Sequence, residues 1–160
     1  MLSCAFTGHR RIEERHKGRI ENLLSRAVAY AYECGCRTFV TGGALGFDTL
    51  AAKEIIRFRL SHPDVRFLII LPCKNQSDAW SDSQINLYEY TLYNADEVEY
   101  VCDEYKDGCM KLRNSRLVEC CDMLIAYVSR PYSGAAQTVR MAEKVGKKVY
   151  NLFPALDSNQ

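Results

Sequence analysis

The sequence lacks any large charge imbalance, because 21 basic and 20 acidic residues leave a formal net charge of +1 at pH 7. Proteins that cover long stretches of nucleic acid usually present a strongly basic surface, so the balance disfavours nucleic acid as a partner. No apolar run approaches the roughly 18 residues of a transmembrane helix, and no basic stretch precedes the first apolar residues. These absences predict a cytoplasmic protein without membrane contact.

Prolines, which interrupt regular secondary structure, are also scarce, with only four in the sequence. The sequence has neither low-complexity segments nor internal repeats. A chain of this length is expected to bury roughly 70% of its unfolded surface as one domain. We therefore predict a single domain over residues 1–153, followed by a short tail at 154–160.

The eight cysteines lack the paired spacing of a zinc site. Cys4, Cys73 and Cys102 lie in or beside apparent strands, where a thiol acts as a small buried hydrophobe. We therefore expect free thiols, no bound metal and no cofactor.

What the sequence does contain is a regular alternation of short apolar runs and helical patterns. The apolar runs predict six strands, at 2–7, 38–41, 65–71, 97–101, 123–128 and 148–152. Apolar residues at helical spacing predict helices around 20–31, 47–58, 85–93, 110–121 and 135–145. Strands that are apolar almost throughout indicate a parallel sheet covered on both faces. The predicted fold class is therefore α/β, a Rossmann-like parallel sheet of about six strands with helices on both faces.

A glycine-rich turn follows the second predicted strand and leads into a helix, with the sequence Thr41-Gly42-Gly43-Ala44-Leu45-Gly46-Phe47-Asp48. Without Cβ atoms, Gly42, Gly43 and Gly46 let an anion approach backbone N–H groups at the positive end of the helix. The turn lacks the Lys-Ser/Thr ending of a P-loop and the spacing of the dinucleotide fingerprint. A tight turn that binds nothing is the alternative. We expect Asp48 to cap its helix, accept ribose hydroxyls or hold a cation.

Polar residues and glycines also follow other strands, at the edge where ligands bind in such sheets. The first strand is followed by Thr7-Gly8-His9-Arg10, and the fifth by a second small-residue helix entrance at Ser133 and Gly134. Arg10 offers a bidentate guanidinium for phosphate, and His9 offers a hydrogen-bond donor or a general acid or base. A surface charge and a loop histidine are the alternatives. Two glycine-bearing turns on one rim predict a shared anionic ligand.

Two further pairs are candidates for the same rim. Gln76 and Trp80 are four residues apart, so the indole could stack on a base if a helical turn begins at Ser77. Arg113 and Asn114 lie on a helix whose apolar positions face elsewhere. A core lid for Trp80, and ordinary surface positions for Arg113 and Asn114, are the alternatives.

Taken in order, four of these motifs resemble the YpsA-like branch of the SLOG superfamily, which is related to the DNA-processing DprA proteins and the LOG phosphoribohydrolases. They are Thr7 to Arg10, Thr41 to Asp48, Leu71-Pro72 with Gln76 and Trp80, and Ser133 to Thr138. The resemblance implies a nucleotide pocket with phosphate at Gly42, Gly43 and Gly46. It places Ser133, Gly134 and Thr138 on the opposite wall.

The same resemblance bears on catalysis. In LOG enzymes a helix arginine and a glutamate together serve hydrolysis of the N-glycosidic bond, and Arg113 matches the arginine by position. Aligning Thr138 with the family threonine places Met141 where the glutamate belongs, and Glu143 would face away by about 200° around the helix. The catalytic residues stay open, with Arg113, His9 and Asp48 as candidates.

Three functions follow as hypotheses. The leading one is binding or sensing of a nucleotide or nucleotide-derived ligand. The alternatives are a nucleotide or nucleoside-monophosphate hydrolase and a DprA-like DNA-binding protein. The LOG resemblance favours a homodimer. The helix with Tyr88, Tyr90, Leu92 and Tyr93 could contact a protein partner, and partly buried packing is the alternative.

Overall fold

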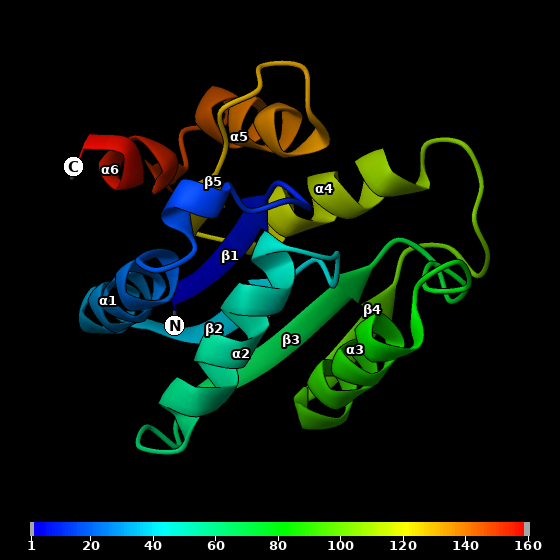
Figure 1. Cartoon of the computed structure of the whole chain (residues 1–160), viewed down its shortest axis with the longest axis horizontal. Coiled ribbons are helices and arrows are strands. Elements are labelled where there is room, and N and C mark those ends of the chain that lie inside the picture. Colours follow the sequence, from blue (N-terminus) through cyan, green and yellow to red (C-terminus); the bar gives the residue numbers. More distant parts are fainter. Residues whose placement is uncertain (1, 159–160) are drawn as a thin grey trace.

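Six parallel strands form one sheet in the order β4-β3-β2-β1-β5-β6 (Figure 1). A computed structural model describes residues 2–158 of the chain. The strands are β1 (Leu2–Gly8), β2 (Cys36–Thr41), β3 (Arg66–Leu71), β4 (Glu97–Tyr100), β5 (Met123–Tyr127) and β6 (Lys148–Asn151). Chain order runs outward from β1 to β4 on one side and through β5 and β6 on the other. The order reverses between β1 and β5, so the loops after these two strands meet at the switch point.

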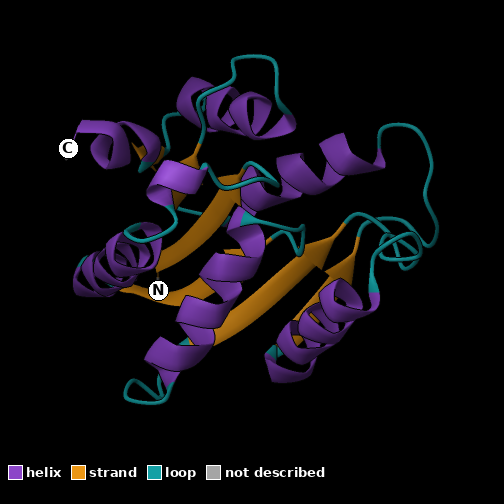
Figure 2. Ribbon diagram, in the orientation of Figure 1, coloured by secondary structure: helices purple, strands orange, loops and turns teal. Residues whose placement is uncertain are grey.

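Helices cover both faces of the sheet (Figure 2). They are α1 (Ile20–Glu33), α2 (Phe47–Arg59), α3 (Asp82–Asn94), α4 (Cys109–Cys120), α5 (Gly134–Lys144) and α6 (Phe153–Ser158), with a short 3-10 turn, η1 (Glu14–His16). Alternate strand residues face opposite layers. Phe6, Phe39 and Phe67 pack with α1, α2, α3 and α6, whereas Ala5 and Val40 pack with α4 and α5. The α/β Rossmann-like prediction is confirmed, and the strand and helix positions agree closely with the sequence pattern.

The segment after Phe153 takes part in the core. Residues 153–158 form α6, and Leu156 is only 2% exposed. The carboxylate of Asp157 lies 2.9 Å from Arg15 Nε and 2.5 Å from Nε2 of the buried His16. These contacts hold part of the predicted tail against η1, whereas 159–160 lie outside the described residues. The domain boundary at 153 stays a prediction.

Helix α3 begins with a capping box, from which a modest stability effect is predicted. The N–H of Gln84 donates to Ser81 Oγ at 3.3 Å, and the N–H of Ser81 donates to Gln84 Oε1 at 2.9 Å. Ser81→Ala removes one acceptor, so we expect a loss of about 1 kcal/mol in the free energy of unfolding by urea titration. Gln84→Glu preserves the reciprocal bond and is the control; an equal loss in both variants would contradict this account.

Along residues 2–158, none of the helices has the length and apolar character needed to cross a membrane.

Candidate functional site

A cavity of about 740 Å³ opens at the carboxyl edge of the sheet, where the loops after β1 and β5 meet α4. This volume lies within the range of small-molecule sites. The walls come from the loop after β1, the glycine turn, one face of α4 and the loop leading into α5. The lining residues are Thr7, Gly8, His9, Arg10, Ala44, Asp48, Met110, Arg113, Asn114, Leu117, Arg130, Pro131, Tyr132, Ser133, Gly134 and Ala135.

The lining is strongly cationic. It contains Arg10, Arg113 and Arg130 but a single carboxylate, that of Asp48. The side chains of Arg10 and Arg130 are exposed, and neither has an ion-pair partner within residues 2–158. Unpaired guanidinium groups beside one cavity favour an anionic ligand, since each can form a bidentate contact with phosphate or carboxylate.

Arg113 differs from the two exposed arginines because it is 95% buried, on the side of α4 that packs towards the sheet. Its Nη1 donates to the carbonyl oxygen of Gly42, and its Nε donates to Asn114 Oδ1 at 2.8 Å. Burial lowers the pKa of Arg113, whereas the charge of Asp48 raises it. The guanidinium stays protonated at neutral pH. Arg113 therefore connects the glycine turn to α4 and keeps a positive charge beneath the cavity.

Gly42 makes this approach sterically feasible. A Cβ atom there would lie 2.7 Å from Arg113 Nη1 and 2.9 Å from Asp48 Oδ2. Both groups would have to move to admit any side chain. Glycine at this position therefore serves close packing of two charged side chains.

Asp48 sits against the glycine turn itself. Its Oδ2 accepts from the N–H of Ala44 at 3.1 Å, whereas its buried Oδ1 has no hydrogen-bond partner among the described residues. Burial raises the pKa of Asp48 to about 6, although Arg113 and the Ala44 N–H oppose this increase. The N-cap of α2 is Gly46, so Asp48 closes the turn instead of capping the helix. The Ala44 N–H in the predicted anion-binding turn is thus already bonded to a side chain of the protein.

The remaining glycines of the turn make structural contacts. Gly46 has φ +78°, and its Cα packs against the backbone of Arg10, while the N–H of Phe47 donates to the His9 carbonyl at 3.1 Å. The carbonyl of Gly43 accepts from Gln76 Nε2 at 3.0 Å. The turn is therefore joined to the loops after β1 and β3.

His9 supports the loop after β5. Its Nε2 accepts from the N–H of Ser129 at 2.9 Å and of Arg130 at 3.3 Å. Two donors to Nε2 require the tautomer that carries its proton on Nδ1. Burial, followed by the charge of Arg130, lowers the pKa of His9. The neutral ring therefore positions the entrance to α5.

The N-terminus of α5 has backbone N–H groups that are free to donate hydrogen bonds. Ser133 Oγ accepts from the Ala136 N–H at 3.1 Å, as an N-cap residue should. Within the described chain, no group accepts from the N–H groups of Gly134 and Ala135, and both residues line the cavity. Free N–H groups at a helix N-terminus attract anions. Among the described residues, the N–H groups of Gly43, Leu45 and Gly46 in the glycine turn also lack an acceptor, but only the free amides of the α5 entrance belong to residues that line this cavity.

The structure brings most of the predicted residues together. Those that line the cavity are Thr7, Gly8, His9, Arg10, Asp48, Arg113, Asn114, Ser133 and Gly134. Gly42, Gly43 and Gly46 lie in the adjoining turn and Gln76 contacts it, but none of them lines the cavity. Thr138 is buried in α5 and donates to the Gly134 carbonyl at 2.9 Å. Trp80 packs edge-on against Tyr88, with ring centroids 5.0 Å apart.

Sequence reasoning did not select several lining residues. Arg130 and Tyr132 had a usable signal, because they follow β5 as His9 and Arg10 follow β1. Met110 and Leu117 have no sequence signal that marks them as site residues, because their apolar helical spacing is that of any core position. Tyr132 is 97% exposed at the rim, so the aromatic ring beside the cavity is that of Tyr132 and not that of Trp80.

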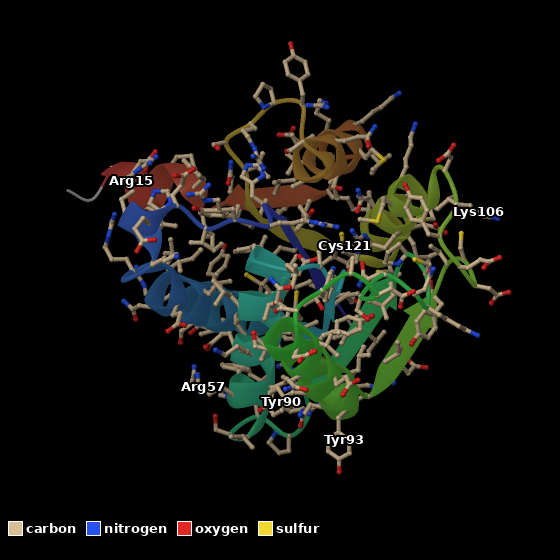
Figure 3. All side chains as sticks on the ribbon, turned by 45° about the vertical axis from the view of Figure 1, so that its right-hand side comes forward. Arg15, Arg57, Tyr90, Tyr93, Lys106 and Cys121 are labelled. Carbon is tan, nitrogen blue, oxygen red and sulfur yellow. The ribbon has the colours of Figure 1, made fainter. Side chains whose placement is uncertain are left out.

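Two other predictions concern metals and partners. In the part of the chain that the structure describes, no cluster of three or more His, Cys, Asp or Glu side chains has the arrangement of a metal site. On α3, Tyr88 is buried, Tyr90 is half exposed, and Tyr93 projects from the helix into solvent (Figure 3). A protein interface there, and a homodimer, stay predictions.

Comparison with known proteins identifies relatives that match along most of the chain. A UPF0398 protein of Bacillus thuringiensis strain Al Hakam is 24% identical over 160 residues, covering 94% of this chain and 87% of the relative. UPF0398 protein BCG9842_B3730 of Bacillus cereus strain G9842 is 26% identical over 133 residues, covering 81% of this chain and 72% of the relative.

Solved structures share the fold. DNA processing protein A (DprA) from Streptococcus pneumoniae superimposes with a TM-score of 0.66 at 18% identity, over 93% of this chain and 49% of that chain. The present chain thus spans about half the length of that protein. The Helicobacter pylori DprA, described with a single-stranded DNA binding mode, gives a TM-score of 0.64 at 23% identity, over 92% of this chain and 63% of that chain.

The family assignment rests on a match that covers β1 from its third residue, all of β2 to β6 and every residue that lines the cavity. The family model YpsA, described as the YspA SLOG family, matches residues 4–153. The chain therefore belongs to the YpsA family of SLOG proteins.

Proposed function

We propose that this protein binds or senses a nucleotide or nucleotide-derived ligand in the cavity at the switch point. The observation that carries the proposal is the convergence of Arg10, Arg130 and the free N–H groups at the start of α5 on one cavity of about 740 Å³. These groups favour phosphate, since cationic side chains and a helix N-terminus act in the same direction. We assign the phosphate to the α5 entrance, because the free N–H groups there belong to residues that line the cavity, whereas Asp48 occupies the Ala44 N–H, the one amide of the glycine turn from a lining residue.

The remaining lining suits a nucleoside. Met110, Leu117 and Pro131 form apolar wall, and Tyr132 stands at the rim where its ring can stack on a base. Apolar walls with a few oriented polar groups are typical of ligand sites.

A binding experiment tests this function. Purified protein is screened by thermal shift with nucleoside mono-, di- and triphosphates, ADP-ribose and cyclic dinucleotides. A ligand present at one hundred times its Kd stabilises by about 2.7 kcal/mol, which is readily visible as a higher melting temperature. Unchanged melting with every ligand would contradict the proposal.

Removal of one phosphate contact should weaken the binding of such a ligand. For Arg10→Ala and Arg130→Ala we expect Kd to rise about 10- to 100-fold by calorimetry, because each deletes a charge-assisted contact. Arg26→Ala on α1 removes an exposed arginine away from the cavity and is the matched control. Equal affinity in all three variants would place the ligand elsewhere.

Hydrolysis is the second candidate, supported by the presence of Arg113 and Asp48 in the same cavity. Met141, at the position of the LOG glutamate, packs beside the core between α4, α5 and the sheet, and Glu143 is exposed. Release of free base from nucleoside monophosphates, abolished in Arg113→Ala, would support N-glycosidic cleavage. If turnover does not exceed that in buffer, hydrolysis is excluded and ligand binding remains as the function.

DNA binding is the third candidate, since the Helicobacter pylori DprA that shares this fold is described as binding single-stranded DNA. The near-neutral charge of this chain argues against many phosphate contacts. A steep loss of oligonucleotide affinity with rising salt would favour it.

A further inference from the structure

Two buried polar atoms of cavity-lining residues, His9 Nδ1 and Asp48 Oδ1, have no hydrogen-bond partner among the described residues, and Asp48 Oδ1 is the one that can only accept. Asp48 is 95% buried and lines the cavity, and its Oδ1 has no hydrogen-bond partner within residues 2–158. Its other oxygen is held by the Ala44 N–H, which fixes the orientation of the carboxylate. A buried acceptor without a donor is unfavourable, so such atoms often mark the place of a missing partner.

A series of contacts separates this carboxylate from the anion-attracting end of the cavity. Arg113 joins the Gly42 carbonyl to the side chain of Asn114. Asn114 in turn lies beside the start of α5, where its Nδ2 would be 3.8 Å from a Cβ on Gly134. Arg113 and Asn114 therefore connect the glycine turn beside Asp48 to the α5 entrance.

The two sides attract different chemical groups. The N–H groups of Gly134 and Ala135, together with Arg130, favour an anion. The Asp48 carboxylate repels an anion and accepts hydrogen bonds only, so the matching ligand group at that side is a neutral donor such as a hydroxyl. A ligand that carries phosphate at one end and hydroxyl groups a few bonds away satisfies both sides.

We propose that Asp48 accepts a hydrogen bond from a ribose hydroxyl, so that the site selects ribonucleotides over nucleotides without sugar hydroxyls. This inference rests on the proposed nucleotide-binding function and specifies its ligand class. Oδ1 is the acceptor, while the phosphate occupies the α5 entrance. Asp48 thereby acts as a specificity-determining residue.

The test compares matched ligand sets by calorimetry at pH 7.5. One set contains the four ribonucleoside 5′-monophosphates, and the other contains the corresponding 2′,3′-dideoxynucleoside 5′-monophosphates. We expect the ribonucleotide set to bind at least about tenfold more tightly, because a hydrogen bond to a charged acceptor is lost in the other set. Equal binding of both sets would overturn the inference while leaving nucleotide binding intact.

Asp48→Asn supplies the second arm. The amide oxygen can still accept from the Ala44 N–H, but the amide nitrogen then presents donors where the ligand needs an acceptor. We expect the preference for the ribonucleotide set to fall to about twofold or less, with dideoxynucleotide affinity changed less than ribonucleotide affinity. An unchanged preference in this variant would overturn the role of Asp48.

Two controls separate the possible failures. Glu143→Gln alters an exposed carboxylate outside the cavity and should keep the full preference. A melting curve of Asp48→Asn verifies that the variant is folded. If neither set binds to the wild-type protein, the nucleotide-binding function itself fails, and this inference fails with it.

Discussion

Gly46→Ala is expected to lower the free energy of unfolding by about 4 kcal/mol or more. Gly46 adopts φ +78° and ψ −118°, a conformation that residues with a Cβ rarely adopt. An added Cβ would also lie 2.7 Å from the Cα of Arg10 and closer still to its carbonyl group. The obstacle is backbone, so a change of side-chain rotamer cannot relieve it.

Gly108→Ala provides the matched control for this prediction. Gly108 is also the N-cap of a helix with positive φ, at +86°, but no atom lies within 4 Å of a Cβ built there. This variant measures the cost of a left-handed helical conformation without a clash, about 1–2 kcal/mol, whereas Gly46 at ψ −118° lies outside that region, so its larger loss combines conformation and contact. Urea unfolding of both proteins gives the difference. Similar losses in the two variants would show that contact with the backbone of Arg10 contributes little.

Asp48→Asn is expected to stabilise the ligand-free protein at pH 7.5 by up to about 3 kcal/mol. Burial raises the pKa of Asp48 from 3.8 to about 6, even with Arg113 nearby. The folded protein therefore binds this proton more tightly than the unfolded chain does. At neutral pH the ionised carboxylate is a net cost to folding, and the uncharged amide removes it.

The sign of the pH dependence follows from the same shift. Between pH 4 and 6 the unfolded chain has released the proton while the folded protein retains it, so the contribution of Asp48 to stability falls as pH rises through this window. Above about pH 6 the loss is complete. The melting temperatures of the wild type and Asp48→Asn should therefore converge at pH 4 and diverge by several degrees at pH 7.5.

Other carboxylates do not obscure this comparison. The pKa of Asp157 is lowered to about 2 by hydrogen bonds from Arg15 and His16, so its contribution is lost only as pH falls towards that value, in both proteins alike. Glu143→Gln should follow the wild-type curve. A melting-temperature difference that does not vary between pH 4 and 7.5 would contradict the account of Asp48. If the prediction holds, the protein sacrifices stability to keep an ionised carboxylate at the cavity.

The positions of the predicted site residues show how much of the site the local sequence pattern can predict. The loops with His9, Arg10, Ser133 and Gly134 follow β1 and β5, and the parallel sheet brings these loops to one edge, as the sequence pattern predicts. Arg113 was selected by helix position and resemblance. Its burial beside Gly42 depends on how α4 packs on the sheet, which no local sequence signal specifies.

Trp80 and Asp48 illustrate what pattern could not resolve. An indole near a strand end can stack on a ligand or pack against its own chain, and the edge-on contact with Tyr88 is set by the long loop between β3 and α3. A carboxylate at the start of a helix can cap that helix or close the preceding turn. The choice depends on where the Ala44 N–H points, which the conformation of the whole glycine turn sets.

The amino-acid sequence alone determined the alternation of strands and helices, the type of sheet and the loops that carry polar residues. These features follow from the periodic spacing of apolar side chains, which is a local property of the chain. The tertiary structure alone decided which free N–H groups belong to the cavity lining, which of the three lining arginines is buried and that Asp48 Oδ1 lacks a donor. These features depend on contacts between residues far apart in sequence, such as Gly42 with Arg113 and Arg10 with Gly46.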